Sequence, residues 1–204
     1  AEQIHYDIAA SAQKVLEEIL MRMVRYIHKN TGQKNLCLGG GVALNGVANY
    51  KILKEGPFEN IFIGPCPDDS GISVGAALWG YYNEHKNNKR VRHLHNYWGP
   101  KYDDQVEETL KKYKLDYKKL ENPSVKAAEL ISNSKIIGWF QGRMEFGQRA
   151  LGNRSILADP RNKNSKDLVN LAVKYRESFR PFAPSILFEY VEEYFNTNGD
   201  NSVN

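Results

Sequence analysis

One segment predicts the fold class of this 204-residue chain: Asn35-Leu36-Cys37-Leu38-Gly39-Gly40-Gly41-Val42-Ala43-Leu44-Asn45-Gly46. It begins with the apolar residues of a short strand, and the glycines that follow suit a loop leading into a helix through Leu53. A helix that starts after such a loop presents backbone N–H groups to phosphate or ribose. The segment lacks the ending of a P-loop and the full spacing of a dinucleotide fold. A tight turn and a nucleotide-contacting loop therefore both stay open.

The regions on both sides of this segment extend the pattern. Apolar residues recur at helical spacing from Ile8 to Ile27, with Asp7 as the expected N-cap and Gly32 as the expected stop. Residues 61–63 predict a second strand, followed by a turn and a helix from Ile72 to about Tyr82. Strands that alternate with helices favour an α/β layer.

The turn after the second strand holds two adjacent carboxylates, Asp68 and Asp69. Oxygen ligands at the carboxyl end of a strand suit a hard cation. Asp69 or Ser70 can equally cap the helix that follows, and the residues alone favour the cap.

A polar stretch rich in Lys, Asn and His, residues 83–100, marks the expected domain boundary. Its histidines lack metal-ligand spacing, and we expect them to be solvated: His85, His93 and His95. The charged run Lys111 to Lys119 is expected to be a solvated face. The remaining expected elements are helices over 103–113, 123–132 and 162–173 and strands over 136–140 and 156–161.

Between the two later strands lies a segment rich in glycine and arginine. It contains Gly142, Gly147 and Gly152 at five-residue spacing, together with Arg143, Arg149 and Arg154. Glycines let the backbone approach a ligand closely, and arginine suits bidentate recognition of phosphate or carboxylate. The alternative is a surface turn that carries solvated charges.

A second basic cluster follows at Lys174, Arg176 and Arg180. Cations this close repel one another, so we expect a bound anion, or the acids Glu145 and Glu177, to offset the repulsion. Salt bridges on a surface loop are the alternative. Residues 139–180 hold nine Lys and Arg against four Asp and Glu, a local excess that suits a small anionic ligand.

Composition and charge give little support to several classes of protein. The net charge of +4 is too small to indicate a nucleic-acid partner, and no apolar run has the length of a membrane span. Cys37 and Cys66 show neither zinc nor disulfide spacing, so a reducing, cytoplasmic setting is expected. The sequence does not indicate an oligomeric state.

Four segments together resemble the O-carbamoyltransferases of the nodulation protein U, cephem and tobramycin carbamoyltransferase group. They are residues 39–46, 67–71, 139–161 and 174–184. The resemblance implies an α/β fold in two partial domains. Residues 1–90 would be the C-terminal part of a Kae1-like domain of the actin/Hsp70 type, and residues 91–204 the N-terminal part of a YrdC-like domain.

The same resemblance implies an ATP-dependent enzyme that forms carbamoyl-adenylate from carbamoyl phosphate and ATP. The carbamoyl group would then pass to a hydroxyl of a small molecule or sugar. Arg149 and Lys174 are the expected catalytic residues that bind the carbamoyl phosphate or adenylate. This site would be supported by Arg143, Arg176 and Arg180. The nucleotide would contact Gly40, Gly41 and Asn45. A divalent metal, iron or magnesium, would bind Asp69.

Two departures from the family pattern lead us to expect a piece that is inactive on its own. The chain has no His-x-x-x-His pair, and the YrdC-like domain stops short after about Phe195. Two alternatives stay open: threonylcarbamoyl transfer to tRNA, and a non-catalytic module that binds nucleotide or RNA.

Overall fold

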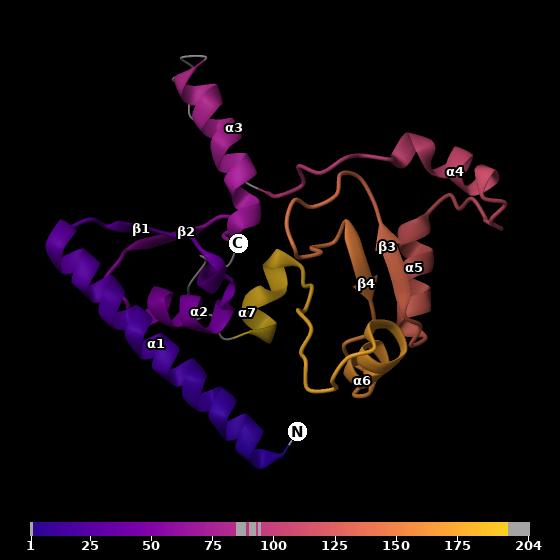
Figure 1. Ribbon diagram of the computed structural model, residues 1–204. Coiled ribbons are helices and arrows are strands. Elements are labelled where there is room, and N and C mark those ends of the chain that lie inside the picture. Colours follow the sequence, from indigo (N-terminus) through magenta and orange to yellow (C-terminus); the bar gives the residue numbers. More distant parts are fainter. Residues whose placement is uncertain (1, 85–88, 90–92, 94, 196–204) are drawn as a thin grey trace. The chain divides into compact units, whose positions relative to one another are not determined.

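The computed structural model describes residues 2–84, 89, 93 and 95–195 and divides the chain into two compact units (Figure 1). Unit 1 comprises Ala1–Lys101 and Arg143–Leu151, and unit 2 comprises Tyr102–Gly142 and Gly152–Asn204. A short part of the Gly/Arg segment thus belongs to unit 1 although it follows residues of unit 2. No helix among the described residues combines the length and the apolar character that crossing a membrane requires.

Unit 1 begins with the long helix α1, Gln3–Thr31. The predicted helix is confirmed, but the prediction of Asp7 as its N-cap is wrong. Glu2 is the N-cap, because its side chain and that of His5 form a capping box, and α1 therefore starts earlier than predicted. The predicted stop is confirmed: Gly32 has φ 62° and its N–H donates to His28 O at 2.8 Å.

A parallel strand pair follows, formed by β1 (Asn35–Leu38) and β2 (Asn60–Ile63). The register pairs Leu36 with Ile61 and Leu38 with Ile63. Between the strands lie the 3-10 turn η1 (Gly41–Leu44) and the helix α2 (Gly46–Glu55). This strand, helix, strand connection confirms the predicted α/β class.

The core of unit 1 is built from buried residues of α1, β1, α2 and the turn before β2. They are Met21, Val24, Leu36, Ile52 and Phe58. Burial of each such side chain contributes roughly 1.5–3 kcal/mol. After β2 the chain forms η2 (Asp69–Gly71) and α3 (Ile72–Asn83), which confirms the predicted helix.

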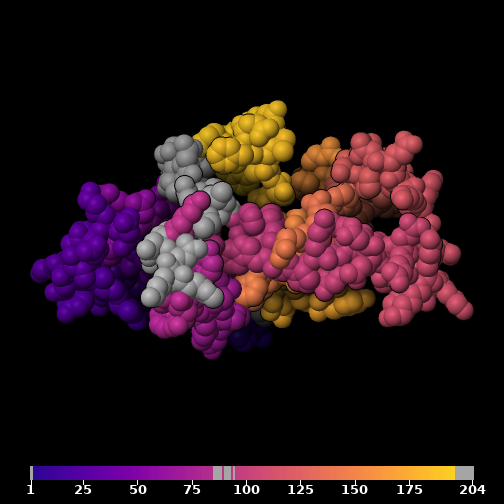
Figure 2. All heavy atoms as spheres, turned by 90° about the horizontal axis from the view of Figure 1, so that it is seen from above, coloured from indigo at the N-terminus to yellow at the C-terminus, as the bar shows by residue number. Residues whose placement is uncertain are grey.

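Unit 2 contains the helices α4 (Val106–Lys112), preceded by η3 (Asp103–Gln105), and α5 (Pro123–Ser132). The strands β3 (Ile137–Phe140) and β4 (Arg154–Leu157) pair antiparallel, and α5 lies beside β3 (Figure 1). The charged run Lys111 to Lys119, which starts in the last turn of α4, is exposed throughout, as predicted, and Figure 2 shows its atoms in rose. Glu107 holds part of this run through an ion pair of 2.8 Å with Lys111.

The last elements of unit 2 differ from the prediction of one helix over 162–173. The structure instead has the short helix α6 (Ser165–Val169) followed by the π turn η4 (Asn170–Lys174). The helix begins late because Asn162 Oδ1 accepts the N–H of Asn164 at 2.9 Å, which forms a turn first. The chain then passes through η5 (Phe188–Tyr190) to α7 (Val191–Tyr194).

Two expectations concern the stretch 83–100. His85 lies outside the described residues, whereas His93 and His95 are exposed, as predicted. The assignment of residues 1–90 and 91–204 to Kae1-like and YrdC-like domains stays a prediction, because division into compact units does not identify the ancestry of either part.

Candidate functional site

Two loops of unit 1 meet at the carboxyl ends of its parallel strands. The N–H of Gly40, after β1, donates to the carbonyl of Pro67, after β2, at 2.6 Å. The carboxyl ends of parallel strands are where α/β sheets bind ligands. Gly40 and Gly41 are exposed there, so their predicted contact with a nucleotide is sterically open.

Asn45, the third residue predicted to contact nucleotide, is engaged inside the protein. Its Oδ1 accepts the N–H of Ala48 at 3.0 Å and so caps α2. Its Nδ2 donates to Gln13 Oε1 of α1 at 2.7 Å. The structure therefore gives Asn45 a role in fastening α2 to α1, and its contact with nucleotide stays a prediction.

Asp68, rather than Asp69 or Ser70, caps the turn after β2. The Asp68 carboxylate accepts the N–H of Ser70 at 3.2 Å, and its other oxygen accepts a hydrogen bond from Gln148 Nε2. The interpretation of Asp69 as the cap is thus wrong. The Asp69 carboxylate is exposed and forms no hydrogen bond or ion pair within the part of the chain that the structure describes.

The surroundings of Asp69 do not amount to a metal site by themselves. Among the described residues, no three His, Cys, Asp or Glu side chains gather closely enough to hold an ion. Iron and magnesium both need several protein ligands or waters, and one exposed carboxylate does not supply them. The predicted metal and its ligand Asp69 stay predictions.

The segment that carries Arg149 packs against the loop after β2. A Cβ on Gly147 would lie 2.9 Å from Cys66 Sγ and 3.0 Å from Pro65 O, so only glycine fits there. The neighbouring Gln148 is the donor to Asp68. Gly147 and Gln148 thus fix the Arg149 backbone beside the strand ends of unit 1.

Glu145 closes this segment into a loop. Its side chain is 4% exposed, and Oε1 accepts the N–H of Leu151 at 2.6 Å. Arg149 therefore lies within a loop that is closed by a hydrogen bond between residues six positions apart. Its guanidinium is exposed and has no hydrogen-bond or ion-pair partner among residues 2–84, 89, 93 and 95–195.

Arg143 has a different environment. Its Nη2 donates to the carbonyl of Trp98 at 3.0 Å, and its backbone forms an isolated bridge with Lys101. These contacts anchor the start of the segment to the chain that precedes unit 2. The supporting role of Arg143 in ligand binding stays a prediction.

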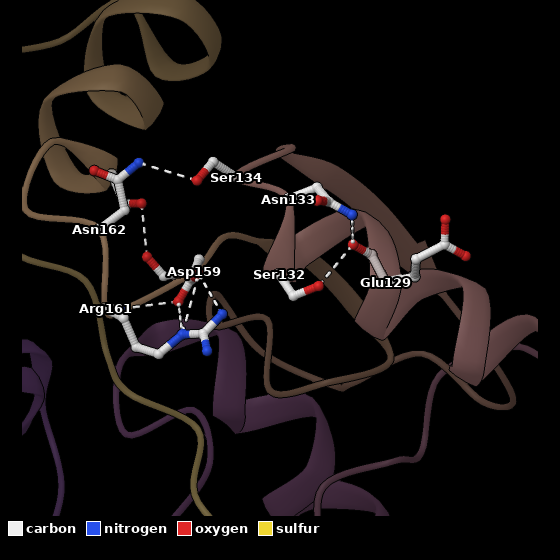
Figure 3. Close-up of polar contacts among 8 residues, drawn as sticks. Glu129, Ser132, Asn133, Ser134, Asp159, Arg161 and Asn162 are labelled. Atoms are coloured by element: carbon white, nitrogen blue, oxygen red, sulfur yellow. Dashed lines mark hydrogen bonds and ion pairs between the residues drawn. The ribbon is translucent and has the colours of Figure 1, made fainter.

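In unit 2 the turn after β4 sets the start of α6 (Figure 3). Asp159 is 6% exposed, and both its oxygens accept from the Arg161 side chain, at 2.8–3.2 Å. Hydrogen bonds from Arg161 lower the pKa of Asp159. The Asp159 carbonyl also accepts from Ser165 Oγ at 2.6 Å, which ties the first residue of α6 to this turn.

The basic cluster at the end of the π turn is ordered by protein contacts. Arg176 Nε donates to Asn170 Oδ1 at 2.7 Å, and its guanidinium lies 4.8 Å from the ring centre of Phe182. Arg180 forms an ion pair of 2.9 Å with Glu177. This pairing confirms the expectation that Glu177 offsets part of the repulsion; a backbone hydrogen bond and the charge of Arg180 lower the pKa of Glu177.

Lys174 is the exception in this cluster. Its side chain is exposed and forms no ion pair with any described residue. The five predicted cations therefore fall into two groups. Arg143, Arg176 and Arg180 have protein partners, whereas Arg149 and Lys174 keep their charges open to a ligand.

The predicted residues are divided between the units. Unit 1 holds Gly40, Gly41, Asn45, Asp69, Arg143 and Arg149, and unit 2 holds Lys174, Arg176 and Arg180. The binding of one ligand by Arg149 and Lys174 together stays a prediction. Sequence reasoning missed Asn170, because a single Asn inside a helical pattern carries no sign that it is buried and holds a neighbouring loop.

Comparison with known proteins gives two matches to family profiles. Residues 1–78 match the carbamoyltransferase N-terminus, and residues 128–203 match the carbamoyltransferase C-terminus. Together they account for more than half of the chain.

Individual relatives are similar over nearly the whole chain. An uncharacterized protein of Synechocystis is 46% identical over 202 residues, covering 95% of this chain and 33% of that protein. Nodulation protein NolO of Bradyrhizobium diazoefficiens is 44% identical over 197 residues, covering 95% of this chain and 36% of that protein. Nodulation protein U of Sinorhizobium fredii is 32% identical over 209 residues, covering 93% and 33%. The chain thus spans about a third of the length of these curated relatives.

Proposed function

The chain belongs to the carbamoyltransferase family, and from this premise we propose that it forms part of an ATP-dependent O-carbamoyltransferase. The acceptor would be a hydroxyl of a small molecule or sugar. The small net charge of the chain, +4, favours such an acceptor over a nucleic acid.

The proposed reaction has two stages. Carbamoyl phosphate and water give carbamate and phosphate, and a carbamate oxygen then bonds to the α-phosphorus of ATP as pyrophosphate leaves. In the second stage the acceptor hydroxyl attacks the carbamoyl carbon, loses its proton and releases AMP. Negative charge grows on phosphate oxygens in the first stage, and fixed cations are the usual means to stabilise it.

One observation carries this proposal: three of the five predicted cations have protein partners, whereas the other two are exposed and without a partner among the described residues. Arg149 lies in a loop closed by Glu145, and Lys174 lies at the end of a turn held by Asn170. Both charges are exposed and have no ion-pair partner among the described residues. Open cations on held backbones can meet a phosphate without first breaking protein contacts.

The three cations that have protein partners play a different, supporting role in the proposed site. Arg143, Arg176 and Arg180 keep the two basic loops in shape and add positive potential around them. We assign binding of the transferring group to Arg149 and Lys174 and support to the other three.

Isotope exchange between pyrophosphate and ATP tests the first stage in the full-length protein that contains this chain. Exchange should appear only when carbamoyl phosphate is present, because formation of the adenylate is the step that releases pyrophosphate. An enzyme that transfers the carbamoyl group yet shows no such exchange would rule out the adenylate route while leaving carbamoyl transfer itself intact.

A further inference from the structure

Asn170 is the most completely buried polar residue of unit 2 among those that the structure describes, at 0% exposure. Its Nδ2 donates to the carbonyl of Arg180 at 3.0 Å and, more weakly, to that of Ser178 at 3.4 Å. Its Oδ1 accepts from Arg176 Nε at 2.7 Å. The amide therefore uses both donors and its acceptor on a single stretch of chain.

The backbone of Asn170 holds the same stretch. Its carbonyl accepts the N–H of Tyr175, five residues on, and the N–H of Arg176 at 3.1 Å. Tyr175 adopts φ 49° and ψ 50°, a left-handed conformation that is unfavourable for a non-glycine residue. Backbone strain of this kind persists only where surrounding contacts over-determine it. Here the Asn170 carbonyl supplies two of those contacts, to the N–H groups of Tyr175 and Arg176.

The consequence of this arrangement is a loop that is ordered before any ligand arrives. Its cations would otherwise repel one another and spread apart. Arg176 is instead fixed between Asn170 and the Phe182 ring, and Arg180 is paired with Glu177. Lys174, directly before the left-handed residue, is the cation that remains open.

We infer that Asn170 is a positioning residue that holds residues 174–180 as a preformed anion-binding loop, in which Lys174 meets a phosphate-bearing ligand. The inference rests on the proposed function for the identity of the ligand and on the contacts of Asn170 for the loop. Preformation matters because a flexible loop loses affinity through the cost of its own ordering.

Binding of pyrophosphate and of ATP to the full chain, measured by titration calorimetry, tests this inference. Asn170→Ala and Lys174→Ala should each weaken binding at least about tenfold. The double variant should bind no worse than Lys174→Ala within about twofold, because Asn170 acts through the loop that carries Lys174. Independent, additive losses would overturn the positioning role.

Val169→Ala is the matched control. Val169 is the adjacent residue and is also buried, at 4% exposure, but its apolar side chain cannot form a hydrogen bond with the loop. Its truncation should lower stability without changing affinity. If Val169→Ala weakened ligand binding as much as Asn170→Ala does, the effect of Asn170→Ala would be general destabilisation. The inference would then be overturned.

Asn170→Asp keeps the experiment decisive if Asn170→Ala does not fold. Aspartate has the same shape and can still accept from Arg176, but it cannot donate to the Arg180 carbonyl. Trypsin should cleave this variant after Lys174 and Arg176 several-fold faster than the unaltered chain. An unchanged cleavage rate would overturn the inference.

The outcomes separate the two proposals. If Lys174→Ala leaves binding unchanged, the proposed role of Lys174 in binding the transferring group is refuted. The assignment of a phosphate-bearing ligand to the loop is then refuted as well. If Lys174→Ala weakens binding but Asn170→Ala does not, the proposed function survives and the role of Asn170 is refuted.

Discussion

Gly147 lies so close to Cys66 that a Cβ at this position would approach Cys66 Sγ to 2.9 Å. The contact joins two stretches that are far apart in sequence and seats the Arg149 loop on the loop after β2. It explains one glycine of the Gly/Arg segment by close packing, where the sequence had suggested approach to a ligand.

Gly147→Ala should therefore destabilise the chain by about 2–4 kcal/mol, the sum of a clash and an unfavourable backbone conformation. Gly152→Ala is the matched control, because Gly152 also has positive φ, at 110° against 125°, but has open space around it. Urea unfolding of both variants measures the difference. Equal losses would show that Gly147 does not pack against Cys66.

Cys66 is buried at 7% exposure, whereas Cys37 is exposed. A thiol reagent should therefore modify Cys37 rapidly and Cys66 slowly in the folded chain. In a Cys37→Ser background, Gln148→Ala should speed the labelling of Cys66 by roughly tenfold, because loss of the Asp68 contact loosens the segment that covers it. An unchanged labelling rate would show that this segment does not shield Cys66.

Asn45→Ala should cost about 1 kcal/mol of stability, the usual loss for an N-cap. The reason is the loss of hydrogen bonds to Ala48 and Gln13. Asn45→Asp is the informative companion, since aspartate still caps α2 but no longer donates to Gln13. It should recover most of the loss in thermal unfolding, and an Asp variant as unstable as the Ala variant would show that capping is not the dominant effect.

The ion pair between Asp159 and Arg161 should make stability depend on pH. Because contacts in the folded state lower the pKa of Asp159, its contribution is present above the unfolded value of about 3.9 and is lost as pH falls through the folded value. Asp159→Asn should thus be less stable than the unaltered chain at pH 7, with a gap that narrows below about pH 4. Thermal unfolding between pH 7 and pH 3 measures the gap, and a gap of constant size would refute the assignment.

Arg149→Ala and Lys174→Ala should each lower carbamoyl-phosphate-dependent exchange by about a hundredfold or more in the full-length protein. Lys163→Ala is the control: it removes the same charge from an exposed position in the same region. Exchange in that variant should stay within about twofold of the unaltered enzyme. If all three variants lose activity equally, net charge rather than two specific cations is responsible.

Local elements of this protein follow from its sequence with little ambiguity. The boundaries of α5 match the prediction, because Pro123 at the start and the Asn122 cap, which accepts the N–H of Val125, are signals contained in the segment itself. The α/β class likewise follows from alternating short-range patterns. The carbamoyltransferase family could also be predicted from the sequence, because the resemblance extends over long segments of the chain.

Hydrogen bonds between residues that are far apart in sequence could be identified only from the tertiary structure. Gln148 meets Asp68 across 80 residues and Arg143 meets Trp98 across 45, and no local pattern reports such contacts. Cations that look equivalent along the chain are therefore unequal in the fold: Arg176 is held by a buried Asn170, whereas Arg149 and Lys174 stay open. The physical reason is that composition sets the charge of a segment, but the path of the backbone decides which polar group lies within hydrogen-bond distance of which charge.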